Sequence, residues 1–314
     1  SGGTTPKNPV LEINGRTKKF EGFTPDILTN HAIDFVRRNR RAPFLLCLHF
    51  RAPHAVWLPV RDEDLAPYKK LDPQIPNPDF PHLNVAKVKR MTREYYASVA
   101  SVDRNLGRLL GLLDELKLAE NTVVIFTSDH GYNLGHNGVW YKGNAQWQLT
   151  KLPPKKWPHI GRKQRPNLYD QSLRVPTAVR WPAVIKPGTV VSETVSNLDW
   201  FPTLASFAGA SDVKESLKRG MDLDGHSYKA HLDGYDLSAY LTGEADESPR
   251  PGFIYFNDDG DVVALRYDNW KLVFLEQRLH GTMGVWAEPF VELRVPKMFN
   301  LRTDPYERAD ITSN

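Results

Sequence analysis

The sequence predicts an α/β fold: a mixed, largely parallel sheet flanked by helices, followed by a smaller C-terminal antiparallel α+β subdomain. First, a helical pattern followed by an apolar strand occurs twice, which is the order of elements in parallel sheets. Second, the pattern changes near residue 248 to short strands joined by tight turns, which is typical of antiparallel sheets. We therefore expect one domain at residues 1–247 and a second at residues 248–314.

The first helix and strand are expected at residues 24–40 and 44–50. Thr24 is a favourable N-cap, Pro25 suits the first turn, and arginines near the end complement the helix dipole. The strand is apolar over nearly its whole length, as in strands covered on both faces. Cys47, the only cysteine, is expected to be buried there, and a single cysteine excludes an internal disulfide or a Cys-based zinc cluster.

The second helix and strand are expected at residues 84–118 and 122–127. Apolar residues recur at steps of three and four throughout the first range, which indicates a long amphipathic helix. A further strand is expected at 177–181, and a helix is expected to start at 199–204. Beyond residue 248, strands at 253–256, 262–267 and 270–275 are separated by turn residues, which predicts an antiparallel meander.

The composition is that of a globular protein, with 40% hydrophobic and 25% charged residues, and excludes a disordered chain. No apolar run reaches the ~18–20 residues that a membrane helix needs. Lys and Arg number 41 against 37 Asp and Glu, and the net charge of +4 is too small to indicate nucleic-acid binding. The polar start, without an initiator Met or an apolar signal region, predicts that the chain begins within a larger protein.

Polar residues that could carry chemistry follow the predicted strands, where open α/β sheets bind ligands. Asp129 and His130 could each offer a metal a lone pair, or Asp129 could cap a turn against which His130 packs. Lys142, in a glycine-flanked loop, could meet an oxyanion or be a solvated surface cation. His54 could be a general acid or a structural loop histidine.

Several segments in this order resemble the type I sulfatases of the alkaline-phosphatase-like superfamily. The segments are 127–131, 134–138 and 140–142, together with 49–54, 173–182, 196–204 and 299–307. The resemblance implies an alkaline-phosphatase-like fold and the hydrolysis of sulfate esters with Ca²⁺ and a formylglycine nucleophile. It also implies a secreted, periplasmic or lysosomal location.

The resemblance assigns roles to individual residues. Asp129 and His130 match calcium ligands, although His130 could instead donate a hydrogen bond to the sulfate, because imidazole is an unusual calcium partner. Lys142 matches the lysine that binds the sulfate, and His54 matches the histidine near the leaving-group oxygen. His136 lies where the family often has a Glu-His pair; we place it and Trp140 among the substrate-binding residues.

Two family segments are not found in these 314 residues: the Cys/Ser-x-Pro-x-Arg nucleophile motif and the two calcium aspartates of the first strand. Cys47 is followed by His49 where that motif has proline. In the family both segments precede everything seen here. We therefore expect the chain to be the later part of a sulfatase, to rely on the N-terminal part of the same protein for the remaining calcium ligands and the formylglycine, and to hydrolyse no sulfate ester by itself.

The segment 146–167 contains many cations and two tryptophans but no acidic residue, which favours a polyanionic sugar. The residues expected to bind a sulfated saccharide are Trp147, Lys155, Lys156, Arg162 and Lys163. A solvated basic loop is the alternative. Other functions left open are a phosphoesterase or phosphonate hydrolase of the same superfamily and an inactive sulfated-glycan binder. Nucleic-acid binding is disfavoured, because the cations form one proline-rich loop rather than a stripe along a helix.

Overall fold

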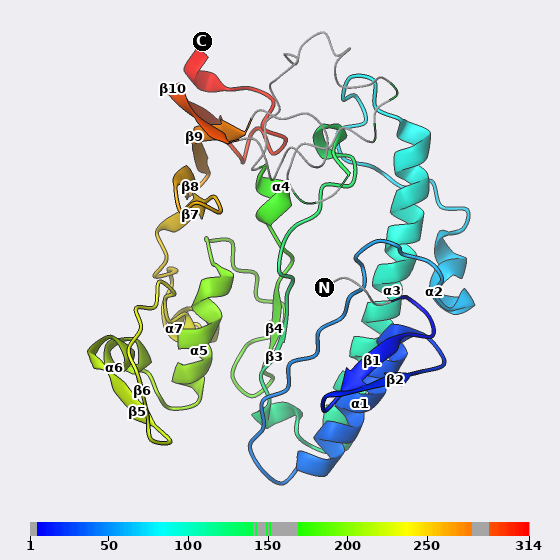
Figure 1. Cartoon of the computed structure of the whole chain (residues 1–314), viewed down its shortest axis with the longest axis vertical. Coiled ribbons are helices and arrows are strands. Elements are labelled where there is room, and N and C mark those ends of the chain that lie inside the picture. The colour runs from blue at the N-terminus through cyan, green and yellow to red at the C-terminus, as the bar shows by residue number, and fades with distance from the viewer. Residues whose placement is uncertain are drawn as a thin grey trace. The chain divides into compact units, whose positions relative to one another are not determined.

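The computed structural model describes residues 5–140, 142, 149, 151, 169–277 and 289–313 (Figure 1). The chain forms two compact units. The first unit contains residues up to Val123 together with Leu134–Gly138 and Leu149–Lys151, and the second contains the remaining residues.

The first unit is built on two helices that lie side by side, α1 and α3 (Figure 1). Apolar residues of both helices are buried, among them Val36 of α1 and Val88 and Leu112 of α3, which removes apolar surface from water. The elements of this unit are β1 (Val10–Ile13), β2 (Arg16–Lys19), α1 (Thr24–Asn39), α2 (Asp62–Leu65), α3 (Val85–Glu115) and the 3₁₀ turns η1 (Ala66–Tyr68), η2 (Ala119–Asn121) and η3 (His136–Gly138). β1 and β2 pair as an antiparallel hairpin.

Both predicted helices of this unit are confirmed. α3 begins after Asn84, whose side-chain oxygen accepts a 3.1 Å hydrogen bond from the amide of Lys87. The prediction that Thr24 is the N-cap of α1 is wrong, because Phe23 takes that position and makes no side-chain cap bond. The hydroxyl of Thr24 donates instead to the carbonyl of Thr5, so it anchors the N-terminal segment on the helix.

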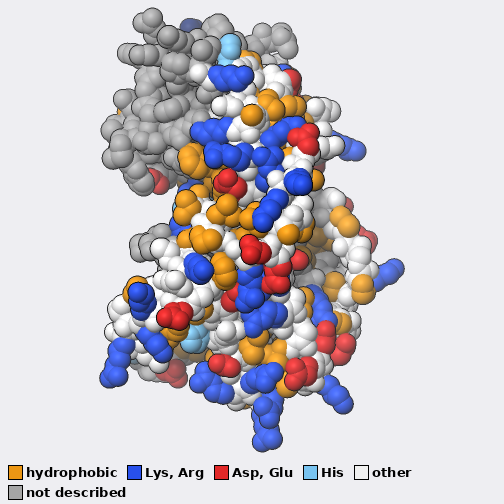
Figure 2. Space-filling view, turned by 90° about the vertical axis from the view of Figure 1, so that its right-hand side faces the viewer, with side chains coloured by type: hydrophobic (Ala, Val, Ile, Leu, Met, Phe, Trp, Pro, Cys, Tyr) orange, Lys and Arg blue, Asp and Glu red, His pale blue; other side chains and the backbone are white. Residues whose placement is uncertain are grey.

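A cluster of charged side chains joins α1, α2 and α3. Arg104 donates two 2.9 Å hydrogen bonds to the carboxylate of Asp64 and a third, of 2.8 Å, to Asp26. Arg61 and Asn105 also donate to Asp26. Figure 2 shows blue and red side chains interspersed over the face that carries these helices, so cations there are matched by carboxylates rather than forming a uniform basic surface.

The prediction of a buried strand at 44–50 is wrong. These residues belong to no strand, and within the described part of the chain no ladder includes them. The side chains alternate between half-buried and exposed, Leu45 is 76% exposed, and Cys47 is exposed rather than buried. The physical reason is that an apolar strand is covered only when other strands and helices pack on it, and the sequence pattern alone does not supply them.

In its described residues, the second unit combines short helices with three antiparallel sheets. Its elements are β3 (Val124–Phe126), α4 (Asp170–Leu173), β4 (Ala178–Arg180), η5 (Asn197–Asp199), α5 (Trp200–Phe207), α6 (Val213–Arg219), β5 (Met221–Leu223), β6 (His226–Tyr228), α7 (Ser238–Thr242), β7 (Gly252–Phe256), β8 (Val262–Tyr267), β9 (Trp270–Gln277), β10 (Phe290–Asn300) and η7 (Ile311–Ser313). β3 pairs with β4, and β5 with β6. Thus the structure is mixed α/β, as predicted.

The predicted C-terminal antiparallel meander is confirmed. Four strands are arranged in the order β10-β9-β8-β7 (Figure 1). One face of this sheet buries Tyr255, Val263, Val273 and Phe299 in a common core. The predicted parallel sheet is not confirmed, because every strand pairing among the described residues is antiparallel. Within the described residues no helix has the length and apolar character to cross a bilayer.

Candidate functional site

The loop that follows β3 carries Asp129 and His130. The carboxylate of Asp129 is 85% exposed, and its Oδ2 lies 3.7 Å from Nε2 of the imidazole of His130. Oδ1 of Asp129 accepts a 3.1 Å hydrogen bond from the amide of His130. Asp129 therefore points an anionic group outward in the loop after β3, while its other oxygen engages the adjacent backbone amide.

The hydrogen bonds of His130 assign its tautomer. Nδ1 lies 2.8 Å from the carbonyl oxygen of Gly131, and because a carbonyl only accepts, Nδ1 carries the proton. The lone pair of the neutral ring is then on Nε2, where the ammonium of Lys142 donates a hydrogen bond of 2.9 Å. The three predicted residues Asp129, His130 and Lys142 thus lie together.

A second set of contacts holds this loop against α4. The backbone amide of Gly131 donates to the carbonyl of Ser172 at 2.9 Å, and the side-chain amide of Asn133 donates to the hydroxyl of Ser172 at 2.8 Å. A Cβ at Gly131 would lie 2.2 Å from the carbonyl oxygen of Gln171. Only glycine allows this approach of two backbones, so the residue after His130 is fixed by packing.

The donor set fits part of a metal site. A histidine that donates Nδ1–H to a backbone carbonyl and presents Nε2 is the arrangement usual for metal-ligating histidines. Asp129 adds carboxylate oxygens, which hard cations prefer. Among the described residues, however, no group of three or more His, Cys, Asp or Glu side chains could hold a metal. Two ligands are too few for Ca²⁺, which takes about 6–8 oxygens.

His54 lies in the first unit, on the loop after residue 50. Its ring Nδ1 lies 2.7 Å from the carbonyl of Ala55, so Nδ1 is the donor and the lone pair of the exposed ring is on Nε2. The same carbonyl accepts a 2.6 Å hydrogen bond from Arg51. This arrangement fixes the ring by its Nδ1 edge and leaves Nε2 available for proton transfer.

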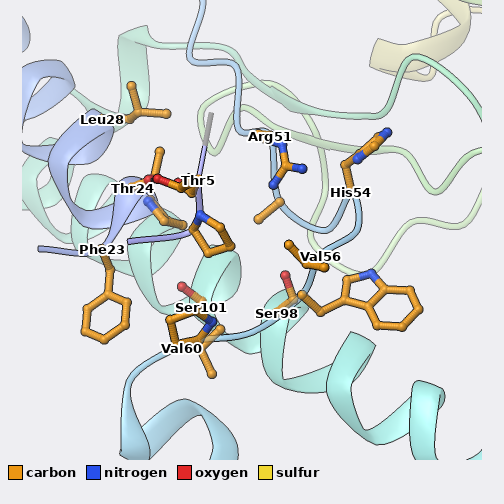
Figure 3. Close-up of a pocket in the computed structure, with 15 residues that line it drawn as sticks. Thr5, Phe23, Thr24, Leu28, Arg51, His54, Val56, Val60, Ser98 and Ser101 are labelled. Carbon is orange, nitrogen blue, oxygen red and sulfur yellow. The ribbon is translucent and has the colours of Figure 1, made fainter. Parts of the chain in front are cut away.

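A hollow beside His54 offers polar groups to a ligand (Figure 3). Its space, including that open to solvent, is about 410 Å³, and the residues that line it include Thr24, Arg51, His54, Trp57, Ser98 and Ser101. The Nε atom of Arg51 is buried without a hydrogen-bond partner in the described part of the chain. Such a donor suits an anionic or hydroxyl-bearing group.

His136 and Trp140 both follow the loop of Asp129 and His130 in the chain, but His136 belongs to the first unit and Trp140 to the second. Burial lowers the pKa of His136 to about 4, so its ring is neutral near pH 7. Asn137, which adopts a left-handed conformation, donates its amide to Asn77 at 3.2 Å. Trp140 is half-buried in the second unit. Their roles in substrate binding stay predictions.

The remaining predicted residues are not tested by the structure. Trp147, Lys155, Lys156, Arg162 and Lys163 lie outside the described residues. Cys47 is exposed and is followed by Arg51 at the spacing of the nucleophile motif, but His49 stands in the place of its proline, so the match is incomplete. Ser172 and Asn197 were not among the predicted site residues, although both contact the loop of Asp129 and His130.

Comparison with known proteins identifies sulfatases among the relatives of this chain. Residues 4–210 match the family model described as Sulfatase. Steryl-sulfatase of Rattus norvegicus is 30% identical over 96% of this chain and 46% of its own length. N-acetylglucosamine-6-O-sulfatase of Bacteroides thetaiotaomicron is 24% identical over 69% of this chain and 49% of its own length. The chain thus spans about half the length of the curated relatives it matches.

A solved structure of a protein in complex with its substrate, D-glucosamine-2-N,6-O-disulfate, has a similar fold. The TM-score is 0.70 with 19% identity, over 99% of this chain and 69% of that chain. This likeness concerns the fold alone.

Proposed function

This chain belongs to the sulfatase family, and from that premise we propose that it carries the Asp129, His130 and Lys142 part of an active site that hydrolyses sulfate esters. The observation that supports the proposal most strongly is that Nε2 of His130 accepts a 2.9 Å hydrogen bond from the ammonium of Lys142 and lies 3.7 Å from the carboxylate of Asp129. In such a cluster the carboxylate and the imidazole lone pair can face a cation, and the ammonium can face an oxyanion.

Each of the three residues has a distinct role in the proposed site. Once the ammonium of Lys142 turns from Nε2 of His130 to the sulfate, Asp129 and that Nε2 would hold Ca²⁺ together with ligands from outside this set. When bound, calcium supplies positive charge that stabilises the sulfate oxygens. Lys142 places its ammonium against a sulfate oxygen as a point charge, which favours the charge that develops there. Gly131 keeps His130 in the tautomer that presents a lone pair.

We propose that His54 acts as the general acid. Its Nδ1–H is engaged with the carbonyl of Ala55, so a proton taken up by the ring resides on Nε2, the exposed nitrogen. From there it can pass to the leaving-group oxygen as the ester bond breaks. His136, neutral because of burial, suits a hydrogen bond to a sugar hydroxyl better than an ion pair with sulfate.

The nucleophile is proposed to come from polypeptide outside these residues, because the Cys/Ser-x-Pro-x-Arg motif does not occur in them. The first calcium aspartates are proposed to have the same origin. In this account the 314 residues bind and polarise the ester but lack the group that attacks it.

The proposed substrate is a sulfated carbohydrate. The basic residues between 146 and 167, which include no carboxylate, are suited to several sulfate groups, and the tryptophans are suited to pyranose rings. One relative acts, by its name, on N-acetylglucosamine 6-sulfate, whereas another is a steryl-sulfatase. A sterol offers no further anionic group to such a segment, so we favour the sugar.

Sulfate release by the complete protein that contains this chain tests the proposal. Glucosamine 6-sulfate, a steryl sulfate and a phosphate monoester are compared, with released anions separated by ion chromatography. We expect sulfate from the sugar, little from the sterol, and no turnover by the 314-residue chain alone. Phosphate release in preference to sulfate would contradict the proposal, and so would turnover by the isolated chain.

A further inference from the structure

Asn197 makes a hydrogen bond to the strand end that carries the candidate site. It is the first residue of η5, and the nitrogen of its side-chain amide donates to the backbone carbonyl of Ser128 at 2.9 Å. Ser128 directly precedes Asp129. Both partners belong to the second unit, so this contact lies within one compact body.

The orientation of the Asn197 amide is fixed by its neighbours. The indole nitrogen of Trp200, which can only donate, lies 3.2 Å from Oδ1 of Asn197. The hydroxyl of Thr127 lies 3.5 Å from the same oxygen. Because Oδ1 faces these donors, the nitrogen must face the carbonyl of Ser128, which can only accept. The amide therefore cannot flip without losing contacts on both sides.

Ser128 in turn contacts the two candidate ligands, Asp129 and His130. Its hydroxyl oxygen lies 3.0 Å from the carbonyl of His130 and 3.3 Å from Oδ1 of Asp129. The single hydroxyl proton serves one acceptor at a time or is shared. A fixed backbone at Ser128 thus restrains the positions of both the carboxylate of Asp129 and the ring of His130.

The support beneath Asn197 is rigid. Asp199, at the other end of η5, is fully buried and accepts hydrogen bonds from the amides of Ser196 and Tyr235, each at 2.7 Å. The buried guanidinium of Arg250 donates to both of its carboxylate oxygens. A residue mounted on such a network can position a loop to a fraction of an ångström, as functional sites require.

We infer that Asn197 is a positioning residue that sets the geometry of the Asp129–His130 pair toward its cation. The inference rests on the proposed function for the identity of that cation but not for the geometry itself. Asn197 touches neither substrate nor cation; it acts through the backbone of Ser128.

The first test uses the 314-residue chain labelled with ¹⁵N-histidine. In the native chain we expect the His130 ring to be held in the Nδ1–H tautomer. N197D keeps the shape and the acceptor toward Trp200 but places an oxygen against the carbonyl of Ser128. We expect this variant to lose the single tautomer and to show an exchanging mixture.

The matched control is N257D, the same substitution at a half-buried asparagine in the β7–β8 turn of the same unit. It should leave the His130 signals unchanged. A merely structural role for Asn197 would lower the unfolding midpoint of N197D without altering the His130 tautomer of the folded protein. If N197D does not fold, W200F removes the donor that orients the amide and should show the same mixture to a smaller extent.

Retention of the Nδ1–H tautomer in N197D and W200F would overturn the inference, as would its absence from the native chain. A second arm titrates Ca²⁺ into the complete protein, where we expect N197D to bind about 10-fold more weakly and N257D to bind as the native protein does. If the tautomer changes as expected but the complete protein releases no sulfate, the proposed function fails and the positioning role stands. If sulfate release and calcium affinity survive N197D, the positioning role fails and the function stands.

Discussion

The backbone amide of Asp170, at the start of α4, donates a 2.6 Å hydrogen bond to the carboxylate of Glu307. Glu307 lies in the segment 299–307 that resembles the closing segment of the sulfatases. Its other oxygen pairs with Lys271 of β9, and both of these side chains are almost completely buried. The closing segment therefore holds α4, whose residue Ser172 in turn holds Gly131 beside His130.

Replacing Lys271 by methionine should destabilise the second unit strongly. The change leaves the carboxylate of Glu307 buried without its cation, and breaking such a pair costs about 3–5 kcal/mol. The free energy of unfolding in urea, measured at pH 8, checks this. The double variant K271M/E307Q, in which neither side chain is charged, should regain most of the loss; a double variant as unstable as K271M would contradict the explanation.

The loss in K271M should depend on pH. Burial raises the pKa of Glu307 above its ordinary 4.5, while Lys271 lowers it. A carboxyl with a raised pKa in the folded state contributes stability that is complete below the ordinary pKa and is lost as the pH rises through the folded-state value. Removing Lys271 raises that pKa further, so the deficit of K271M should be smaller at pH 5 than at pH 8. An equal deficit at both values would argue against this origin.

A Gly131→Ala substitution should displace the loop of the candidate site. The added methyl group would lie 2.2 Å from the carbonyl of Gln171 and 2.6 Å from that of Arg174, and neither backbone can give way cheaply. We expect a loss of roughly 1–3 kcal/mol in unfolding free energy and a change in the His130 ring signals. Gly111→Ala in α3, where nothing lies within 4 Å, is the control and should be neutral or stabilising.

The sequence was sufficient for elements whose pattern is local. The three-and-four spacing of apolar residues predicted α3, and the turn residues around 257–261 and 268–269 predicted the β7–β9 meander. The strand expected at 44–50 failed because burial of a strand depends on distant partners, which its own residues do not specify.

The candidate site could be predicted only in part. Asp129, His130 and Lys142 are chemically distinctive and lie within a short stretch, so their association was foreseeable. The role of Asn197 was not foreseeable, because its partner is a backbone carbonyl 69 residues away. Every residue has such a carbonyl, so the sequence does not single out this one. Thr24 was misplaced for a similar reason: its hydroxyl is taken by the carbonyl of Thr5.

Asp26→Asn should destabilise the first unit near neutral pH. Burial by itself raises the pKa of Asp26, but hydrogen bonds from Arg104, Arg61 and Asn105 outweigh it and hold the pKa below its ordinary 3.8. The resulting stability is present above pH 3.8 and is lost as the pH falls through the lowered value. D26N should be less stable by roughly 1.5–3 kcal/mol at pH 7. In thermal unfolding this difference should shrink at acid pH; a constant difference would refute the electrostatic origin.

His136 should stay neutral across the physiological range. Burial lowers its pKa from 6.5 to about 4, since the charged ring would lose its hydration. The ring proton shifts in an NMR titration should therefore hardly move between pH 8 and pH 5 and should have their midpoint near pH 4. A midpoint above pH 6 would show that the ring is hydrated or paired with an anion.

Calcium affinity of the complete protein tests most directly the proposal that Asp129 binds calcium and Lys142 binds the sulfate. Calorimetric titration of D129N should show binding at least about 10-fold weaker than in the native protein. K142M, which removes an ammonium from beside His130, should bind calcium as tightly or more tightly and yet release no sulfate. Unchanged calcium affinity in D129N, or calcium binding lost in K142M, would contradict the assignment of these side chains to opposite charges.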